Sequence, residues 1–246
     1  MKKIFLLLVL ILQLFAGCSS DDSETAASTD GLLLKKVVYT FANDTDTMVY
    51  SYFGTKLNTI TFDNGRVTKY LYEGDKIKTI TISENNEVVM TITHTYDAQG
   101  RIIKAKRLDL PDMESAMEYT YNADNTVSRN DYMIVAGMQQ AGVQGKYFFG
   151  SNGEVSHFER YYGSEIYTTT YTYDNMKNPM LHVTGLNEMS INQFHFNQLT
   201  ETVTNRAGEL TSLGTYVFEY NNQGFPLKSQ YHHSDGTNYK MDYFYE

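Results

Sequence analysis

The chain of 246 residues has one cysteine, three prolines and no tryptophan. A single cysteine cannot form a disulfide within the chain, so no covalent cross-link supports the fold. Few prolines leave the backbone free to form strand ladders. The sequence also lacks a phosphate-binding loop, a zinc spacing, a dinucleotide fingerprint and a Gly-x-Ser-x-Gly elbow. We therefore expect no cofactor, no metal site and no enzymatic activity, and the sequence assigns no catalytic residue.

Basic residues are also scarce. The chain has 20 Lys and Arg against 29 Asp and Glu, a formal charge of −9. This balance argues against nucleic acid as a partner and against direct adhesion to anionic headgroups. An enzyme that uses scattered carboxylates stays a minor alternative.

The chain begins with an export signal. Lys2 and Lys3 precede an almost wholly apolar stretch from Ile4 to Leu14, which is shorter than the ~20 residues of a spanning helix. Phe15-Ala16-Gly17-Cys18 follows and resembles the lipobox of bacterial lipoproteins, with Phe in place of the commoner Leu. The resemblance implies that residues 1–17 are a signal peptide. It also implies that the Cys18 thiol carries the lipid that attaches the protein to a membrane.

Residues 18–31 predict a tether. The stretch after Cys18 is small, polar and acidic and has no aromatic residue, so it cannot bury enough surface to fold. Fully extended, it reaches about 40 Å. Asp21, Asp22 and Glu24 resemble the acidic export signal of some surface lipoproteins, although a solvated linker explains them equally well. The expected location is the outer membrane, with the domain facing the periplasm or the cell surface.

Residues 32–246 predict a single domain of repeats. Aromatic residues that precede turns recur every 23 to 28 residues, which is typical of a repeat architecture. They are Tyr72, Tyr96, Tyr121, Phe149, Tyr173, Phe196, Tyr220 and Phe244. Between the turns, residues alternate between aromatic and Thr-rich faces, as in Tyr167 to Tyr173, and this alternation is the signature of strands. Asn64-Gly65 is a strong hairpin signal.

The predicted fold is therefore all-β. About eight hairpin repeats, or roughly 15 strands of ~7–9 residues, form an antiparallel up-and-down meander. A sheet this wide twists and curls, so we expect a barrel, a half-barrel or a wrapped sheet with the period-24 aromatics on its concave, buried face.

The turns resemble those of the tyrosine-aspartate (Rhs/YD) repeat family. Thr95 to Ile102 fits best, with Tyr96, Asp97, Gly100 and Arg101 in place. The resemblance implies a continuous β-sheet shell. The chain has no toxin domain of the kind that some such shells enclose.

Candidate binding residues are harder to assign, and the ligand-binding residues stay unknown. His232, His233 and Asp235 offer metal-ligand chemistry, but adjacent strand residues point to opposite faces. The 21 tyrosines and 13 phenylalanines either fill the interior or form a surface for sugar rings or apolar ligands. The insertion from Asp131 to Lys146, which lengthens its repeat, is the loop most suited to a specific contact.

The sequence leaves three classes of function open. The first is a non-catalytic module that binds glycan, peptide or lipid. The second is a structural or accessory envelope protein that acts through a partner protein. The third, less favoured, is a hydrolase.

The lipoprotein hypothesis gives a direct prediction. Replacing Cys18 with Ala should move the protein out of the membrane fraction of fractionated cells, because the thiol is the proposed attachment point. Retention as firm as that of the wild type would contradict it.

Overall fold

The structure is a computed structural model that describes residues 31–42, 44–109, 113–135, 137–191 and 195–246. The predicted signal peptide, Cys18 and nearly all of the predicted tether lie outside these residues. The described part of the chain contains sixteen strands and no helix. They are β1 (Leu34–Phe41), β2 (Asp44–Phe53), β3 (Lys56–Phe62), β4 (Val67–Glu73), β5 (Lys76–Glu84), β6 (Glu87–Tyr96), β7 (Ile102–Asp109), β8 (Met113–Tyr121), β9 (Val127–Val135), β10 (Met138–Phe149), β11 (Val155–Tyr162), β12 (Glu165–Tyr173), β13 (Gln198–Thr204), β14 (Leu210–Tyr220), β15 (Pro226–His233) and β16 (Asn238–Tyr245).

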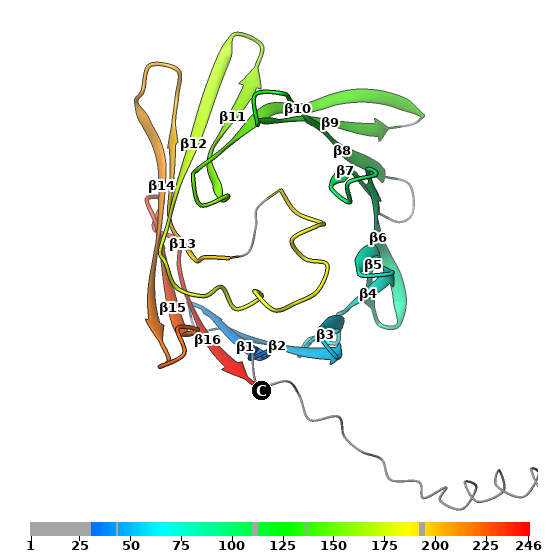
Figure 1. Ribbon diagram of the computed structural model, residues 1–246, viewed down its shortest axis with the longest axis vertical. Coiled ribbons are helices and arrows are strands. Elements are labelled where there is room, and N and C mark those ends of the chain that lie inside the picture. Colours follow the sequence, from blue (N-terminus) through cyan, green and yellow to red (C-terminus); the bar gives the residue numbers. More distant parts are fainter. Residues whose placement is uncertain (1–30, 43, 110–112, 136, 192–194) are drawn as a thin grey trace, which may run out of the picture. The chain divides into compact units, whose positions relative to one another are not determined.

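Each strand pairs antiparallel with its neighbours in chain order, and β1 also pairs with β16. The sheet therefore closes into a barrel (Figure 1). The predicted up-and-down meander is confirmed, and the barrel is the form that it takes.

The repeated turn has a defined hydrogen-bond pattern. In the turn after β6, the Asp97 amide donates to the Arg101 carbonyl over 2.9 Å, and the Gly100 amide donates to the Asp97 carbonyl over 3.0 Å. The Asp97 carboxylate accepts the amides of Gln99 and Arg101. Gly100 has a φ of 86°, a conformation that glycine adopts without steric cost. The same two main-chain bonds recur in the turns that begin at Asn122, Gly150, Asn205 and Asn221.

The repeated tyrosines secure the barrel end that contains the Asp97 turn, which is opposite the end that contains the Asn205 turn. Four strands have, as their last or next-to-last residue, a tyrosine whose hydroxyl donates to the main-chain carbonyl of the first or second residue of the strand before it. The pairs are Tyr52 to Leu34 over 2.8 Å, Tyr96 to Ile77 over 2.7 Å, Tyr121 to Ile102 over 3.0 Å and Tyr173 to Val155 over 3.0 Å. The residues that accept these bonds form most of a ring of buried aliphatic side chains: Leu34, Leu57, Ile77, Ile102, Val127 and Val155. The repeat of about 24 residues in the sequence therefore corresponds to one hairpin, and each hairpin from β1–β2 to β11–β12 contributes one aliphatic side chain to this ring.

Residues 174–197 are named the inner segment, of which residues 174–191 and 195–197 are described and lie inside the ring of strands (Figure 1). The segment begins and ends at one turn, where the Asp174 amide donates to the Asn197 carbonyl over 3.0 Å. Asp174 and Asn197 thus occupy the places that Asp97 and Arg101 hold in the short turn. The barrel end that receives the segment is called the segment end, and the opposite end is the far end.

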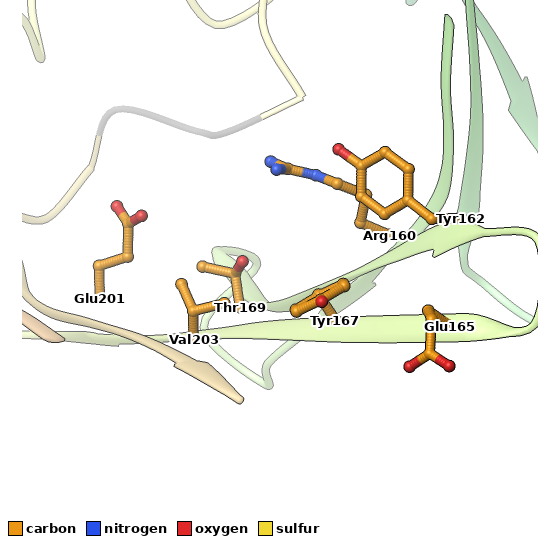
Figure 2. A pocket seen from close by; sticks show the side chains of 7 residues that line it. All are labelled: Arg160, Tyr162, Glu165, Tyr167, Thr169, Glu201 and Val203. Atoms are coloured by element: carbon orange, nitrogen blue, oxygen red, sulfur yellow. The ribbon is translucent and has the colours of Figure 1, made fainter. Parts of the chain in front are cut away.

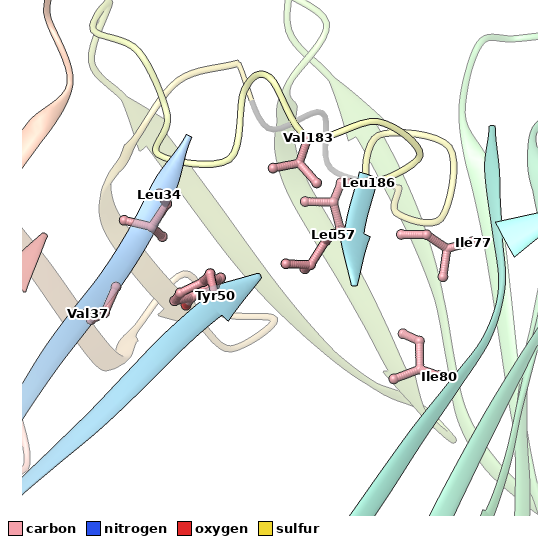
Figure 3. Packing of buried hydrophobic residues seen from close by; sticks show 8 residues of the cluster. All are labelled: Leu34, Val37, Tyr50, Leu57, Ile77, Ile80, Val183 and Leu186. Carbon is pink, nitrogen blue, oxygen red and sulfur yellow. The ribbon is translucent and has the colours of Figure 1, made fainter. Parts of the chain in front are cut away.

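The inner segment packs against the aliphatic ring. Val183 and Leu186 contact the buried cluster that includes Leu57 and Ile77 (Figure 3). Thr184 adds polar contacts by donating its amide to the Thr55 carbonyl over 3.0 Å. Each buried aliphatic side chain contributes about 1.5–3 kcal/mol, so the segment and the ring stabilise each other.

Other contacts of the inner segment lie elsewhere around the barrel. The carboxylate of Glu154, which is 1% exposed, accepts the His195 amide over 3.0 Å. The Lys177 amide donates to the Gly224 carbonyl over 3.0 Å. The segment thus joins turns on several sides of the ring.

These contacts define the two faces of the sheet. Strand residues that meet Val183 and Leu186 face inward, and residues directly opposite one another across paired strands share a face. The tyrosines 167, 171 and 173 face inward, and the threonines 168, 170 and 172 face outward. The predicted division into an aromatic inner face and a Thr-rich outer face is confirmed.

Two members of the period-24 series were wrongly placed. Phe244 is 44% exposed and lies under Lys36 on the outer face, because Tyr243 and Tyr245 take the inward positions. Phe196 ends no strand. The apparent repeat between Tyr173 and Phe196 is the inner segment, which keeps the length of a hairpin but forms none.

The role of the tyrosine ring can be tested at Tyr121. Tyr121→Ala should lower the free energy of unfolding by about 3 kcal/mol, the lower end for a core aromatic, because the ring is half-buried. Tyr121→Phe should cost about 1 kcal/mol, the value of one hydrogen bond. The measurement is chemical denaturation. An equal loss of unfolding free energy in both variants would contradict the prediction that the Tyr121 ring contributes more than its hydroxyl.

Candidate functional site

Three arginines face inward on alternate strands. Arg107 lies on β7, Arg129 on β9 and Arg160 on β11. Arg107 lies opposite Ile92, whose side chain packs against the buried cluster, and this places Arg107 on the inner face. Gly145 of β10 lies opposite both Arg129 and Arg160, so these two arginines share a face. Together the three arginines are called the arginine row.

Two members of the row are paired with an aspartate two residues further along the same strand. Arg107 Nε and Nη2 each donate to the Asp109 carboxylate over 2.8 Å. Arg129 Nε and Nη2 donate to the Asp131 carboxylate over 2.8 and 2.6 Å. Residues i and i+2 of a strand share a face, so an Arg-x-Asp sequence forms this fork within one strand. The fork raises the pKa of the Arg129 guanidinium above its ordinary value.

Arg160 has no such partner. Tyr162 stands two residues further along, where the other strands have aspartate. Among the described residues, Arg160 Nε is buried without a hydrogen-bond partner. Its guanidinium carbon lies 5.9 Å from the centre of the Phe158 ring, and that of Arg129 lies 5.7 Å from the same centre. Phe158, which is 3% exposed, thus holds both guanidinium groups in place.

The Arg160 side chain lines a hollow of about 480 Å³. The lining residues come from β11, β12 and β13: Arg160, Tyr162, Glu165, Tyr167, Thr169, Glu201 and Val203. In Figure 2 the side chains of Arg160 and Glu201 project to the same side of these strands, whereas Glu165 points away. Tyr162 and Tyr167 meet edge to face, with their ring centres 6.0 Å apart. The hollow therefore combines aromatic faces, one cation, two carboxylates and several hydroxyls in its lining.

Tyr171 adjoins the hollow, directly opposite Glu201. Burial, with Glu201 as the next contribution, raises the pKa of Tyr171 to about 12, against the opposing effects of Arg160 and Arg129. The phenol therefore keeps its proton at neutral pH and offers a hydrogen-bond donor beside the Glu201 carboxylate.

A second hollow of about 590 Å³ lies where β3 and β4 separate. These strands pair at only three positions, Thr59 with Lys69, Ile60 with Thr68 and Thr61 with Val67. Toward the segment end Tyr72 enters the gap, and its hydroxyl donates to the Thr184 carbonyl of the inner segment over 3.1 Å. We take the first hollow as the candidate site, because it is lined by Arg160, whose buried Nε lacks a hydrogen-bond partner among the described residues.

The residues singled out from the sequence are placed apart from this hollow. His233 Nδ1 lies 2.7 Å from the Asp235 carboxylate, and His232 Nδ1 lies 2.6 Å from Asn238 Oδ1. The described residues contain no group of three or more side chains arranged to hold a metal ion. The stretch from Asp131 to Lys146 is mostly strand, in β9 and β10, rather than a loop.

No helix among the described residues is long and apolar enough to cross a membrane.

Comparison with known proteins supports the fold alone. No family model and no curated protein matches the sequence. Among solved structures, a porin-like protein from Bacteroides vulgatus matches with a TM-score of 0.60 and 15% identity, covering 88% of this chain and 99% of that one. A porin-like protein from Bacteroides uniformis matches with a TM-score of 0.54 and 11% identity, covering 87% and 98%. The barrel of this chain is therefore similar in fold to these solved proteins.

The arginine row was not predicted from the sequence. Its signal is the recurrence of Arg-x-Asp in Arg107 to Asp109 and Arg129 to Asp131, followed by Arg160-Tyr161-Tyr162. The alternation of strand faces was sufficient to place these residues together on the inward face.

Gly145 makes room for Phe158, and this can be tested. A Cβ atom at Gly145 would overlap the Phe158 ring and the Glu159 carbonyl oxygen. Gly145→Ala should therefore destabilise the barrel by about 1–3 kcal/mol in chemical denaturation, the usual cost of overpacking. Gly150→Ala is the control, because its Cβ would come close to the Asn152 side-chain oxygen, at 2.9 Å, and would stay 3.8 Å from the Glu154 carbonyl oxygen. A loss at Gly150 as large as that at Gly145 would contradict the packing argument.

Proposed function

We propose that this chain is a non-catalytic glycan-binding lipoprotein of the bacterial cell envelope. The observation that carries the proposal is the hollow on the inner face, where Arg160 and Glu201 stand beside Tyr162 and Tyr167. Aromatic faces stack on the apolar faces of sugar rings, and charged or hydroxyl groups bond to sugar hydroxyls. A volume of about 480 Å³ is of the size expected for a small-molecule site.

The lining favours a glycan over the other ligands that the sequence left open. A lipid would leave Arg160 and Glu201 desolvated without partners, at a cost of several kcal/mol. An extended peptide binds best along an unpaired strand edge, but β11, β12 and β13 are paired on both sides.

The outer wall supports a barrel that stands in water. Lys104 and Glu118 form an ion pair at 2.9 Å on the outer face, and Lys106 and Glu114 form another at 2.8 Å. A membrane-spanning barrel instead has an apolar outer band about 25 Å tall, in which each Lys costs about 2–4 kcal/mol at the midplane. An aqueous domain held by lipid on Cys18 fits both this wall and the export signal.

The start and the end of the described domain lie at one end of the barrel. Leu33 pairs with Glu246 at the segment end, so the tether joins the barrel there. The hollow extends to Tyr162 and Glu165, which flank the β11–β12 turn at the far end. The hollow therefore lies toward the barrel end opposite the one that the tether joins, and the proposed location of the domain is the outer membrane, facing the periplasm or the cell surface.

Ligand-detected NMR on the full-length protein in detergent, with a panel of oligosaccharides, tests the proposal. Tyr167→Ala should weaken glycan binding about tenfold, since loss of an aromatic contact costs up to about 1.5 kcal/mol. Tyr161→Ala is the matched control, because Tyr161 lies on the outward face of β11 and its hydroxyl bonds to Glu159. Equal weakening by both variants, or turnover of the bound sugar, would contradict the proposal.

A second candidate function, an accessory protein that acts through a partner, has one observation in its favour. The far end carries exposed apolar side chains on the β7–β8 and β9–β10 hairpins: Met113, Met133, Val135 and Met138. Exposed apolar clusters of this kind mark contact surfaces. Binding to another envelope protein, with no glycan bound, would favour this function.

A further inference from the structure

We infer that the ligand carries a single anionic group, a carboxylate or a sulfate, which Arg160 binds. This inference rests on the proposed function and names the class of sugar that the hollow takes. It predicts an acidic sugar rather than a neutral one.

Arg160 differs from Arg107 and Arg129 in having no aspartate two residues further along its strand. On β7 and β9, an aspartate two residues after the arginine satisfies the guanidinium fork within the protein. On β11 the corresponding residue is Tyr162. No ion pair to Arg160 forms among the described residues, and its buried Nε lacks a hydrogen-bond partner there. At the position where β7 and β9 have an aspartate, β11 has Tyr162, whose side chain lines the hollow.

A ligand can supply the missing group. Carboxylate and sulfate both present two oxygens to the guanidinium fork, and such charge-assisted pairs are about twice as strong as neutral hydrogen bonds. The Arg160 side chain is also held in advance, because it lies against Phe158, which packs on Gly145. A positioned guanidinium loses less side-chain entropy on binding.

Glu201 limits the charge of the ligand. Its carboxylate lines the same hollow and faces the same side as Arg160 (Figure 2). A carboxylate accepts hydrogen bonds from sugar hydroxyls and repels further negative groups. Glu165 also borders the hollow, although its side chain points away. With one cation and two carboxylates in its lining, the hollow suits a sugar that has no more than one negative group and has free hydroxyls.

Tyr162→Asp gives the sharpest test, because it restores on β11 the Arg-x-Asp sequence of β7 and β9. We expect the new carboxylate to form an ion pair with Arg160, so that the guanidinium stays in place but no longer binds an anionic ligand. Arg160→Gln removes the charge outright. Arg107→Gln is the matched control, since it removes an inward charge that is already paired and lies outside the hollow. Far-UV circular dichroism checks that each variant keeps its β-sheet.

The probes are galactose, galacturonic acid and galactose 6-sulfate, measured by ligand-detected NMR on the full-length protein in detergent. The wild type should bind at least one of the acidic sugars tenfold or more tightly than galactose. Which acidic sugar binds more tightly identifies the anionic group as carboxylate or sulfate. Tyr162→Asp and Arg160→Gln should abolish this preference, and Arg107→Gln should keep it. Added salt should weaken binding of the acidic sugar alone.

The two proposals fail in different ways. If galactose binds as tightly as the acidic sugars, or if Arg107→Gln abolishes the preference as fully as Arg160→Gln does, the anionic inference is overturned and glycan binding stands. If neither neutral nor acidic sugars from the oligosaccharide panel and these probes bind, the proposed function is overturned and the inference falls with it.

Discussion

The pairing of β1 with β16 is the interaction on which the rest of the structure depends. Seven residue pairs join these strands, from Leu34 with Tyr245 to Phe41 with Tyr239. Without this pairing both strands would be free edges, which invite aggregation. Closure also gives the sheet an inside, so that the aromatic face becomes a wall. The aliphatic ring and the arginine row both rely on that inside.

Closure creates a second requirement, which is to fill one end of a wide barrel. Barrels of this size have interiors wider than their own side chains can fill. The inner segment meets this need with Val183 and Leu186, which bury their side chains against the aliphatic ring. The glycine between Thr184 and Leu186 allows close contact there. Gly185 has a φ of 84°, and a Cβ at this position would lie 2.6 Å from the Asp75 carbonyl oxygen.

Local pattern was sufficient to predict much of the fold. Alternation in Tyr167 to Tyr173 identified the faces, and the Asp97 to Gly100 turn identified the repeat. Both depend on neighbours along the chain. The sequence left a barrel, a half-barrel and a wrapped sheet open. Closure depends on the pairing of β1 with β16, and these strands lie at opposite ends of the domain sequence, where local pattern gives no information.

The site was less accessible from sequence. The inner segment has nearly the length of one repeat, so period alone counted it as a hairpin between Tyr173 and Phe196. Arg160 is distinguished only by comparison with Arg107 and Arg129, once all three are known to share a face. Its hollow also needs Glu201 from β13, which reaches β12 only after the inner segment returns to the wall.

The narrow neck of the inner segment has a consequence for how such barrels diversify. The segment leaves and rejoins the wall at Asp174 and Asn197, which are hydrogen-bonded as in an ordinary turn. An insertion at such a neck leaves the register of β12 with β13 unchanged. Recombination or slippage at this one turn can therefore exchange the interior of the barrel while its wall is inherited intact. Related chains are expected to vary most there in length.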